Sequence, residues 1–296
     1  MNEWVHPAGT TADGGFDTSI LPGPPGGSAG LSHTGLQVVS LDAGESRAVG
    51  AGELEYIVVP LAGSATVEVD GASYELAGRR DVFGSATDVL YVPRDTPFTL
   101  TSVGGGRYAL CSATARGSFP VTHLAADRVP DEFRGAGTAS RRVRNFGVPG
   151  VLDADSIIAC EVITPAGNWS SYPPHKHDEE REGVETSLEE IYYFELRQEP
   201  GSPAADDAAF GYARVYGSSQ ERPIDVLAEV RSGDVVLVPH GWHGPAMAPP
   251  GYDMYYLNVM AGPGETRAWL ICDDPAHGWV RETWSRQAID PRLTAD

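Results

Sequence analysis

Short apolar or alternating segments recur along the chain, and Gly, Pro or Asp-Gly separates each from the next. Segments of this length with turn residues at both ends predict β-strands. The first series covers residues 36–41, 54–61, 65–69, 73–76, 89–92 and 98–101, and the second covers 156–163, 190–196, 210–216, 224–230, 234–238 and 252–259. Ala65–Val69 alternates strictly and is followed by Asp70-Gly71, which predicts a two-residue hairpin. The pattern therefore predicts an all-β protein.

The two series share an order of strands, and each contains a Val-rich strand that ends in Pro. Asp88–Pro93 reads DVLYVP and Asp234–Pro239 reads DVVLVP. This internal similarity predicts a duplicated β-unit of about 100 to 120 residues. We expect an extended N-terminal arm with little strand potential at 1–30, a first barrel or sandwich domain at 31–135, and a second at 136–296 that includes a C-terminal extension.

Composition excludes several classes of protein. The 296 residues are 41% hydrophobic and carry 41 acidic against 21 basic side chains, a formal net charge of −20. Such a charge disfavours nucleic acids and anionic membranes as partners. No apolar run approaches the roughly 20 residues of a spanning helix, and the first residues lack a signal-peptide layout. With three scattered cysteines in addition, we expect a cytoplasmic protein that does not bind membranes.

The histidines of the second half carry the chemistry. His175 and His177 are two residues apart, so on an extended chain both imidazoles point the same way and can share one metal ion. Glu190 opens a strong strand, and His243 follows the Val-rich strand. Three imidazoles and one carboxylate leave coordination positions open for water or substrate, as a catalytic metal requires. We predict one divalent metal per chain, held by these four residues.

Two of these ligands have competitors nearby in the sequence. A strict H-x-H-x4-E spacing selects Glu182, but Gly-Val-Glu-Thr follows it and predicts a loop. Ile-Tyr-Tyr-Phe follows Glu190, so we favour Glu190 at the start of a strand. His240 competes with His243, because the second motif is one residue short. A single histidine is more commonly packed than ligating, and the prediction depends on the combination of both motifs.

Four segments give the chain a resemblance to known proteins: Pro173–Asp178 (PPHKHD), Leu188–Phe194 (LEEIYYF), Val238–Pro245 (VPHGWHGP) and Asp273–Trp279 (DDPAHGW). The H-x-H pair, the strand-initial Glu and the later Gly/Pro/His segment resemble the two motifs of the cupin superfamily, and the duplication resembles a bicupin. The fuller strings resemble the 5-deoxy-glucuronate isomerase family of myo-inositol catabolism. The resemblance implies two cupin-type β-sandwich or barrel domains, with His243 at the position of the family's ligand.

The first half departs from the cupin pattern. Glu55 precedes Tyr-Ile-Val-Val and is taken as the equivalent of the ligand Glu, but no H-x-H precedes it. Phe98 stands where the last His is expected. We therefore expect a degenerate, metal-free cupin domain with a role in structure or assembly.

The resemblance implies a metal-dependent aldose-ketose isomerase that converts 5-deoxy-glucuronate to 5-dehydro-2-deoxy-gluconate through an enediolate. Proton transfer needs a group near the reacting carbon. Strand parity makes Tyr192 and Tyr256 candidates, although inward tyrosines commonly only fill a barrel. Lys176, the one lysine of the chain, is the third candidate catalytic residue. Alternation points it away from the metal, but an ammonium at a twisted strand end can hold a carboxylate or move a proton.

Other functions remain open on these residues. A related uronate ketol-isomerase shares the metal motif, a cupin dioxygenase uses similar ligands with Fe(II) and oxygen, and a storage or sugar-binding bicupin needs no catalysis. The His and Glu ligands accept zinc, manganese, iron, cobalt or nickel. We expect a small-molecule uronate as the substrate and a homo-oligomer as the assembly.

Overall fold

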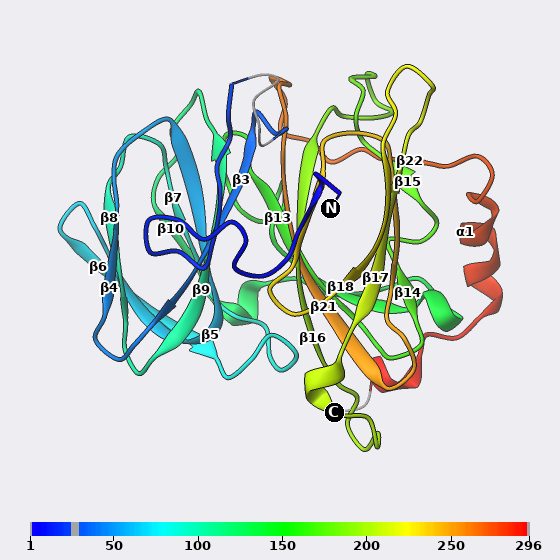
Figure 1. Ribbon diagram of the computed structural model, residues 1–296. Helices are drawn as coiled ribbons and strands as arrows, with labels where there is room; N and C mark the ends of the chain where they lie inside the picture. Colours follow the sequence, from blue (N-terminus) through cyan, green and yellow to red (C-terminus); the bar gives the residue numbers. More distant parts are fainter. Residues whose placement is uncertain (1, 25–29, 295–296) are drawn as a thin grey trace.

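The computed structural model describes residues 2–24 and 30–294 as two antiparallel β-barrels that lie side by side (Figure 1). This confirms the all-β, two-barrel prediction. Part of the predicted arm, together with residues 1 and 295–296, lies outside the described residues. No helix among the described residues is both long and apolar enough to cross a membrane.

The first barrel is a nine-stranded sheet that folds over on itself. Its longest strand, β5 (Leu54–Val69), pairs with β7 and β9 in its first part and with β6 and β8 in its second part. Gly63 lies at the bend with a φ of 86°, where an added Cβ would come within 2.5 Å of the Gly105 carbonyl. The other strands are β2 (Thr18–Ile20), β3 (Thr34–Leu41), β4 (Ser46–Val49), β6 (Ala72–Arg79), β7 (Val89–Val92), β8 (Phe98–Ser102), β9 (Gly106–Thr114) and β10 (Thr122–Leu124).

The second barrel consists of a seven-stranded and a six-stranded sheet. The larger one runs β1 (Val5–His6), β19 (Val235–Val238), β16 (Glu189–Gln198), β21 (Tyr252–Ala261), β13 (Ile158–Thr164), β12 (Arg141–Gly147) and β11 (Asp131–Arg134). The smaller one contains β18 (Asp225–Val230), β17 (Gly211–Tyr216), β20 (Trp242–Met247), β15 (His175–Lys176) and β22 (Cys272–Asp273), with β14 (Trp169–Ser170) paired to β20.

Apolar side chains that alternate along the strands form three separate hydrophobic cores. One apolar cluster fills the interior of the first barrel and another fills the second. A third cluster, which includes Ile57, Phe146, Ile191 and Tyr255, draws on strands of both barrels and lies between them. Strands at this interface bury both faces, so they read as nearly continuous apolar segments in the sequence.

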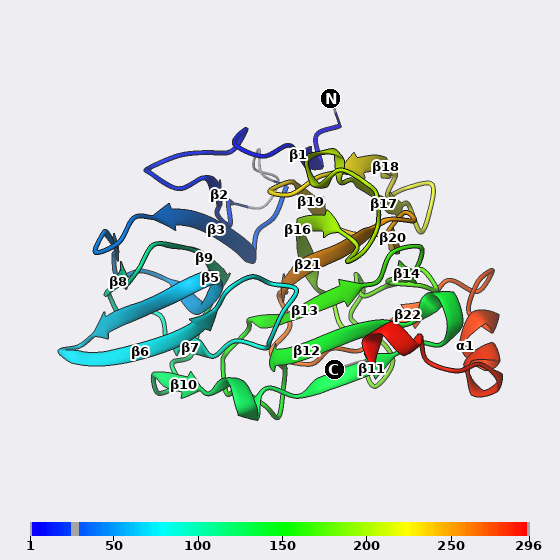
Figure 2. The same cartoon turned by 90° about the horizontal axis from the view of Figure 1, so that it is seen from below.

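The structure confirms one of three local predictions and differs from the other two. The hairpin is confirmed: Val69 pairs with Ala72 across Asp70 and Gly71, both with positive φ, as a type I′ turn requires. The arm contains strand structure that the sequence analysis missed, because β1 pairs with β19 of the second barrel and β2 pairs with β3 of the first. The polar stretch before residue 145 also contains strands, since β11 pairs with β12 in the second barrel (Figure 2).

The expected equivalence of Glu55 with the ligand Glu is wrong. Glu55 pairs with Ala113, and Glu189 pairs with Ala261 at the corresponding position of the second barrel. Glu55 accepts hydrogen bonds from the Tyr91 hydroxyl at 2.7 Å and from the backbone N–H groups of residues 155–157 at 2.7–2.9 Å. Glu189 accepts N–H groups of residues 32–34 at the start of β3. Each glutamate thus binds backbone N–H groups of the other barrel, and we call these two contacts the reciprocal clamps.

The C-terminal segment closes one end of the second barrel. Asp273 on β22 pairs with His175 on β15, and the Asp274 N–H donates to the Pro174 carbonyl at 2.8 Å. The short helix α1 (Trp279–Thr283) then lies at the outer end of the second barrel, away from the first (Figure 1). This packing places the C-terminal extension beside the predicted metal ligands.

Candidate metal centre

Three strands of the second barrel bring together residues that are far apart in the sequence. His175 lies on β15, His177 directly follows that strand, Glu190 lies near the start of β16, and His243 lies on β20. His175 pairs with His243 across the sheet. Glu190 is on the strand of the facing sheet that pairs with β19, opposite Val238.

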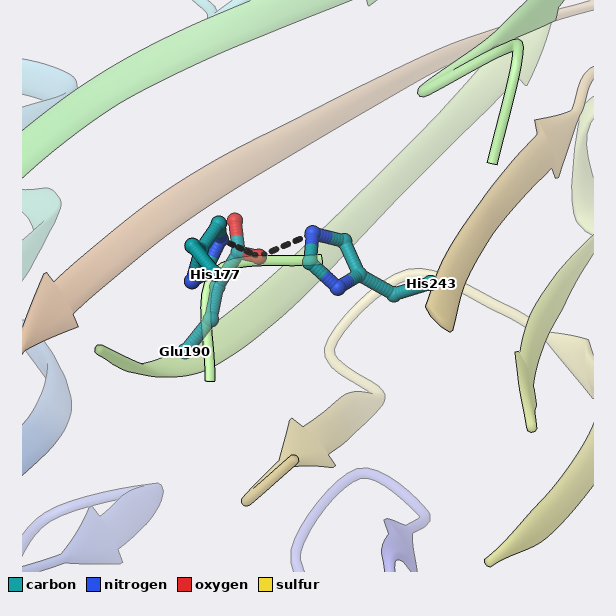
Figure 3. A group of neighbouring side chains, drawn as sticks. All are labelled: His177, Glu190 and His243. Carbon is teal, nitrogen blue, oxygen red and sulfur yellow. Dashed lines mark ion pairs between the residues drawn. The ribbon is translucent and has the colours of Figure 1, made fainter. Parts of the chain in front are cut away.

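His177, Glu190 and His243 form a compact buried group (Figure 3). The Nε2 atoms of His177 and His243 lie 3.3 Å and 3.1 Å from Oε2 of Glu190, and each side chain is at most 2% exposed. These three atoms have no hydrogen-bond partner within the described chain. Buried acceptor atoms that face one another without a hydrogen-bond donor destabilise a fold. A metal cation would remove this cost, because two imidazoles and a carboxylate are typical metal ligands.

Contacts behind these ligands set the orientation of the two imidazoles. Nδ1 of His177 lies 3.3 Å from the Leu188 carbonyl, and Nδ1 of His243 lies 3.3 Å from the Gly241 carbonyl. A carbonyl only accepts, so we place the ring proton on Nδ1 in both cases. Nε2 is then left as the unprotonated donor atom that a metal requires.

His175 lies beside this group rather than within it. Its ring centroid is 4.5 Å from that of His243 and 6.3 Å from that of His177. Its nitrogens are outside the set of ligand atoms that lie within 4.8 Å of one another. Burial lowers the pKa of His175 to about 3, which holds the ring in the neutral form. Its assignment as the fourth ligand stays a prediction.

Asn258 on β21 is a further member of the site. Its Nδ2 donates to Oε1 of Glu190, the oxygen that does not face the histidines. Burial alone would raise the pKa of Glu190, but the His243 and His177 rings and the Asn258 amide outweigh it and lower the pKa. The carboxylate is therefore ionised. Sequence reasoning gave Asn258 no role, although it shares strand parity with Tyr256.

The competing ligands lie apart from the group. Glu182 is exposed, in a turn closed by the bridge between Arg181 and Glu185. His240 is only half-buried and is not part of the compact group. The structure thus brings Glu190 and His243, and neither competitor, to the interior of the barrel.

Tyr192 and Tyr256 share a hydroxyl partner that the sequence did not reveal. Both phenol oxygens lie near Oγ of Ser171, at 3.1 Å and 3.2 Å, and the two rings are 5.1 Å apart. The Tyr192 ring centroid is 6.2 Å from that of His243. Burial raises the pKa of both tyrosines, and the charge of Glu190 raises that of Tyr192 further. Both are therefore protonated hydroxyl groups near the metal ligands, suited to donate hydrogen bonds.

Lys176 points into a separate ionic network. Its Nζ donates to Asp178 at 2.7 Å and to Glu185 at 2.8 Å, and it lies 5.7 Å from the centroid of the Trp242 ring. Burial would lower the pKa of Lys176, but the two carboxylates outweigh burial and raise it. The ammonium is thus charged and paired away from Glu190 and His243. Its catalytic role stays a prediction, and Glu185 is a partner that spacing alone does not identify.

Two antiparallel barrels with a buried cluster of imidazoles and one carboxylate in the second define a cupin-type protein. The fold is shared with an oxalate decarboxylase from Lactobacillus farciminis, which is 12% identical and covers 82% of this chain and 80% of its own, with a TM-score of 0.57. At that identity the similarity is one of fold alone.

Sequence comparison gives the particular family. Residues 17–280 match the KduI/IolB family, and the chain belongs to this family. It is 40% identical over 258 residues to the 5-deoxy-glucuronate isomerase of Geobacillus thermodenitrificans, covering 86% of this chain and 89% of the relative. The 5-deoxy-glucuronate isomerase of Bacillus subtilis strain 168 is 38% identical, with coverage of 85% and 89%. An IolB-like protein from Salmonella typhimurium is 35% identical, with a TM-score of 0.82 and coverage of 94% and 99%.

Proposed function

We propose that this chain is an isomerase that interconverts 5-deoxy-glucuronate and 5-dehydro-2-deoxy-gluconate. The relatives that cover most of its length are named for this substrate. The single observation that carries the mechanism is the group of three buried, unpaired ligand atoms on His177, Glu190 and His243. We assign His175 as a fourth ligand, because its neutral ring lies against His243.

The reaction moves a proton between adjacent carbons and needs no net oxidation. A divalent metal ion bound here would draw charge from neighbouring carbonyl and hydroxyl oxygens. Asn258 keeps the Glu190 carboxylate in place through its amide. Tyr192 and Tyr256, as protonated phenols, are suited to donate hydrogen bonds to substrate oxygens in a site from which apolar neighbours such as Phe194 exclude water.

The donor set accepts several ions, and zinc, manganese, iron, cobalt and nickel all suit imidazole and carboxylate ligands. The oxalate decarboxylase of Bacillus subtilis, a neighbour in fold at 12% identity, is described with Mn(II) centres. We propose one divalent ion per chain, without a choice among these metals.

The test is an anaerobic assay of the purified protein on 5-deoxy-glucuronate, followed by NMR in deuterated water. We expect conversion to the ketose without oxygen, nicotinamide or nucleotide, and deuterium at the carbon that receives the proton. A protein that is inactive without oxygen and active with it would be a dioxygenase, and the proposal would then be wrong. Glu182→Ala is the matched control, since this exposed carboxylate lies outside the group and its loss should leave turnover unchanged.

A further inference from the structure

Arg141, at the start of β12, is a buried arginine on the inner wall of the second barrel. It shares strand parity with Val143, which belongs to the interior cluster of this barrel together with Phe194 and Tyr256. The residue is 5% exposed. Its Nη1 donates to the backbone carbonyls of Ala139 at 3.0 Å and Tyr172 at 3.5 Å. Its Nε and Nη2 have no hydrogen-bond partner in the described part of the chain.

The charges around Arg141 do not balance. On β11, opposite Arg141, Arg134 forms a two-point contact with Glu132. Arg281 in α1 forms a two-point contact with Asp273. No carboxylate of the described residues forms an ion pair with Arg141. Three guanidinium groups against two carboxylates leave one positive charge at this end of the barrel, in a chain whose net charge is −20.

The two other buried arginines of the described chain each have a carboxylate partner, whereas Arg141 has none. Arg79 and Arg144 both contact the Glu161 carboxylate. Arg267, which is only half-buried, donates to three backbone carbonyls at 2.6–2.7 Å, one from each of its nitrogens. Burial without a counter-ion, together with the charges of Arg134 and Arg281, lowers the pKa of Arg141 to about 10. An enclosed guanidinium with free donors is the group that binds a planar carboxylate in two-point fashion.

Arg141 is connected to the metal centre through one loop. Tyr172, whose carbonyl accepts from Arg141, lies between Ser171 and the Pro173-Pro174-His175 segment. The Ser171 hydroxyl contacts Tyr192 and Tyr256 at the site. On the other side, the Arg141 guanidinium lies 5.5 Å from the centroid of the Trp284 ring. Arg141 lies behind the wall of a hollow of about 360 Å³. Its contact residues Ala139, Tyr172 and Trp284 line this hollow together with exposed Trp169 and Trp279.

We propose that Arg141 binds the carboxylate of the sugar acid while the opposite end of the open chain lies at the His177–Glu190–His243 group. This inference rests on the proposed function and extends it, since it makes Arg141 the residue that selects an acidic sugar over a neutral one. An acyclic uronate has its carbonyl and carboxylate at opposite ends. A fixed guanidinium and a fixed metal group would therefore orient the chain and place the reacting carbons near the tyrosine hydroxyls.

The first test compares 5-deoxy-glucuronate with its neutral analogue 5-deoxy-glucose in wild type, Arg141→Met and Arg141→Lys. A charge-assisted two-point hydrogen bond predicts a preference for the acid of about 100-fold in kcat/KM, which Arg141→Met should abolish through KM. Arg141→Lys keeps the positive charge but cannot form the two-point hydrogen bond, so it should retain part of the preference for the acid. Arg142→Met is the matched control, because Arg142 lies on the opposite face of β12 and contacts Asp131 and Leu293. An unchanged preference in Arg141→Met would overturn the proposal.

The second test separates this site from the reaction. Binding of D-glucuronate and of D-glucose is followed by tryptophan fluorescence, since Trp284 lies beside the guanidinium. We expect D-glucuronate to bind wild type and Arg142→Met but not Arg141→Met, with thermal unfolding confirming that each variant is folded. If this dependence holds while no isomerisation occurs, the carboxylate site stands and the proposed reaction fails. Equal binding of the acid to wild type and a folded Arg141→Met would refute the site even if the enzyme isomerises its substrate.

Discussion

The two barrels use the same strand positions for opposite purposes. Tyr56 in the first barrel pairs with Val92, and Glu190 in the second pairs with Val238, and both valines immediately precede a proline. Tyr56 is therefore the structural equivalent of Glu190. Where the second barrel presents an ionised carboxylate to two imidazoles, the first presents an aromatic ring to its interior cluster.

The facing sheet repeats the contrast. Phe98 pairs with Val49 in the first barrel, at the place where His243 pairs with His175 in the second. The Tyr56 and Phe98 rings meet edge to face with centroids 5.4 Å apart. A barrel of this topology thus tolerates either a polar ligand cluster or an apolar plug at one place. The side chains at a few paired positions decide which it contains.

The strongest way to break this comparison is to give the second barrel the side chain of the first. His243→Phe replaces a ligand with the residue found at the equivalent position, Phe98. We expect loss of bound metal and fall of isomerase activity to background, because the remaining atoms no longer surround a cation. Elemental analysis and a turnover assay measure both. His240→Phe is the control, and retention of metal by His243→Phe would contradict the assignment.

The interface between the barrels depends on a buried ionic cluster. Glu161 on β13 contacts Arg79 of the first barrel at 2.7 Å and Arg144 of β12 at 3.0 Å. Glu161→Gln leaves two buried guanidinium groups without their counter-charge, so we expect a loss of about 3–5 kcal/mol in the free energy of unfolding. Urea denaturation measures it, and a loss below 1 kcal/mol would show that the cluster does not hold the barrels together.

The same carboxylate predicts a pH dependence. Burial would raise the pKa of Glu161, but Arg79 and Arg144 outweigh burial and hold it below its ordinary value of 4.5. The stabilisation is therefore complete above that value and is lost as the pH falls through the lower folded-state pKa. The difference in stability between wild type and Glu161→Gln should narrow below about pH 4. A difference that stays constant down to pH 3 would rule out this linkage.

A smaller effect is expected at the reciprocal clamps. Glu55→Gln weakens hydrogen bonds to three backbone N–H groups by removing the charge, and we expect a loss of about 1–3 kcal/mol in stability with metal content unchanged. Glu189→Gln should behave alike, since Glu189 holds the N–H groups of residues 32–34. Thermal unfolding and elemental analysis of the two variants test the symmetry. Loss of metal in Glu55→Gln would show that the first barrel binds an ion after all.

The smallest change expected is that of Tyr192→Phe, which removes one hydroxyl beside the ligands and keeps the ring. We expect kcat to fall about tenfold, as for the loss of a single hydrogen bond near 1.4 kcal/mol, with KM and metal content nearly constant. Steady-state kinetics measure this, with Tyr193→Phe on the other face of β16 as the control. An unaltered kcat would show that the Tyr192 hydroxyl has no part in the reaction and that the side chain only packs in the barrel interior.

Local patterns in the sequence are enough for most of the strands, for the duplication, and for His177, Glu190 and His243, which the fold brings together. Alternation and the His-x-His spacing are short-range features. Register is a long-range property. The pairing that equates Tyr56 with Glu190, and Glu55 with Glu189, is visible only when neighbouring strands are aligned. The β11–β12 pair was missed because β11 is largely exposed and β12 buries polar residues such as Arg141, Arg144 and Asn145, so neither strand shows a simple apolar alternation.

The roles of two further residues, Ser171 and Arg141, become visible only through tertiary contacts. Ser171 lies outside any strand, with a φ of 46°, and meets Tyr192 and Tyr256 only after the barrel closes. Arg141 reads as one member of a polar, arginine-containing stretch until folding places it inside the barrel without an acidic partner. Sequence spacing carries no signal for either residue.

The most direct test of the account is the metal-to-chain ratio of wild-type protein purified without added metal, measured together with turnover before and after chelation. One barrel with a ligand cluster and one with an apolar plug predict a ratio of one divalent ion per chain. Activity should then disappear with that ion and return when it is restored. A ratio of two, or full isomerase activity in protein freed of metal, would contradict the account.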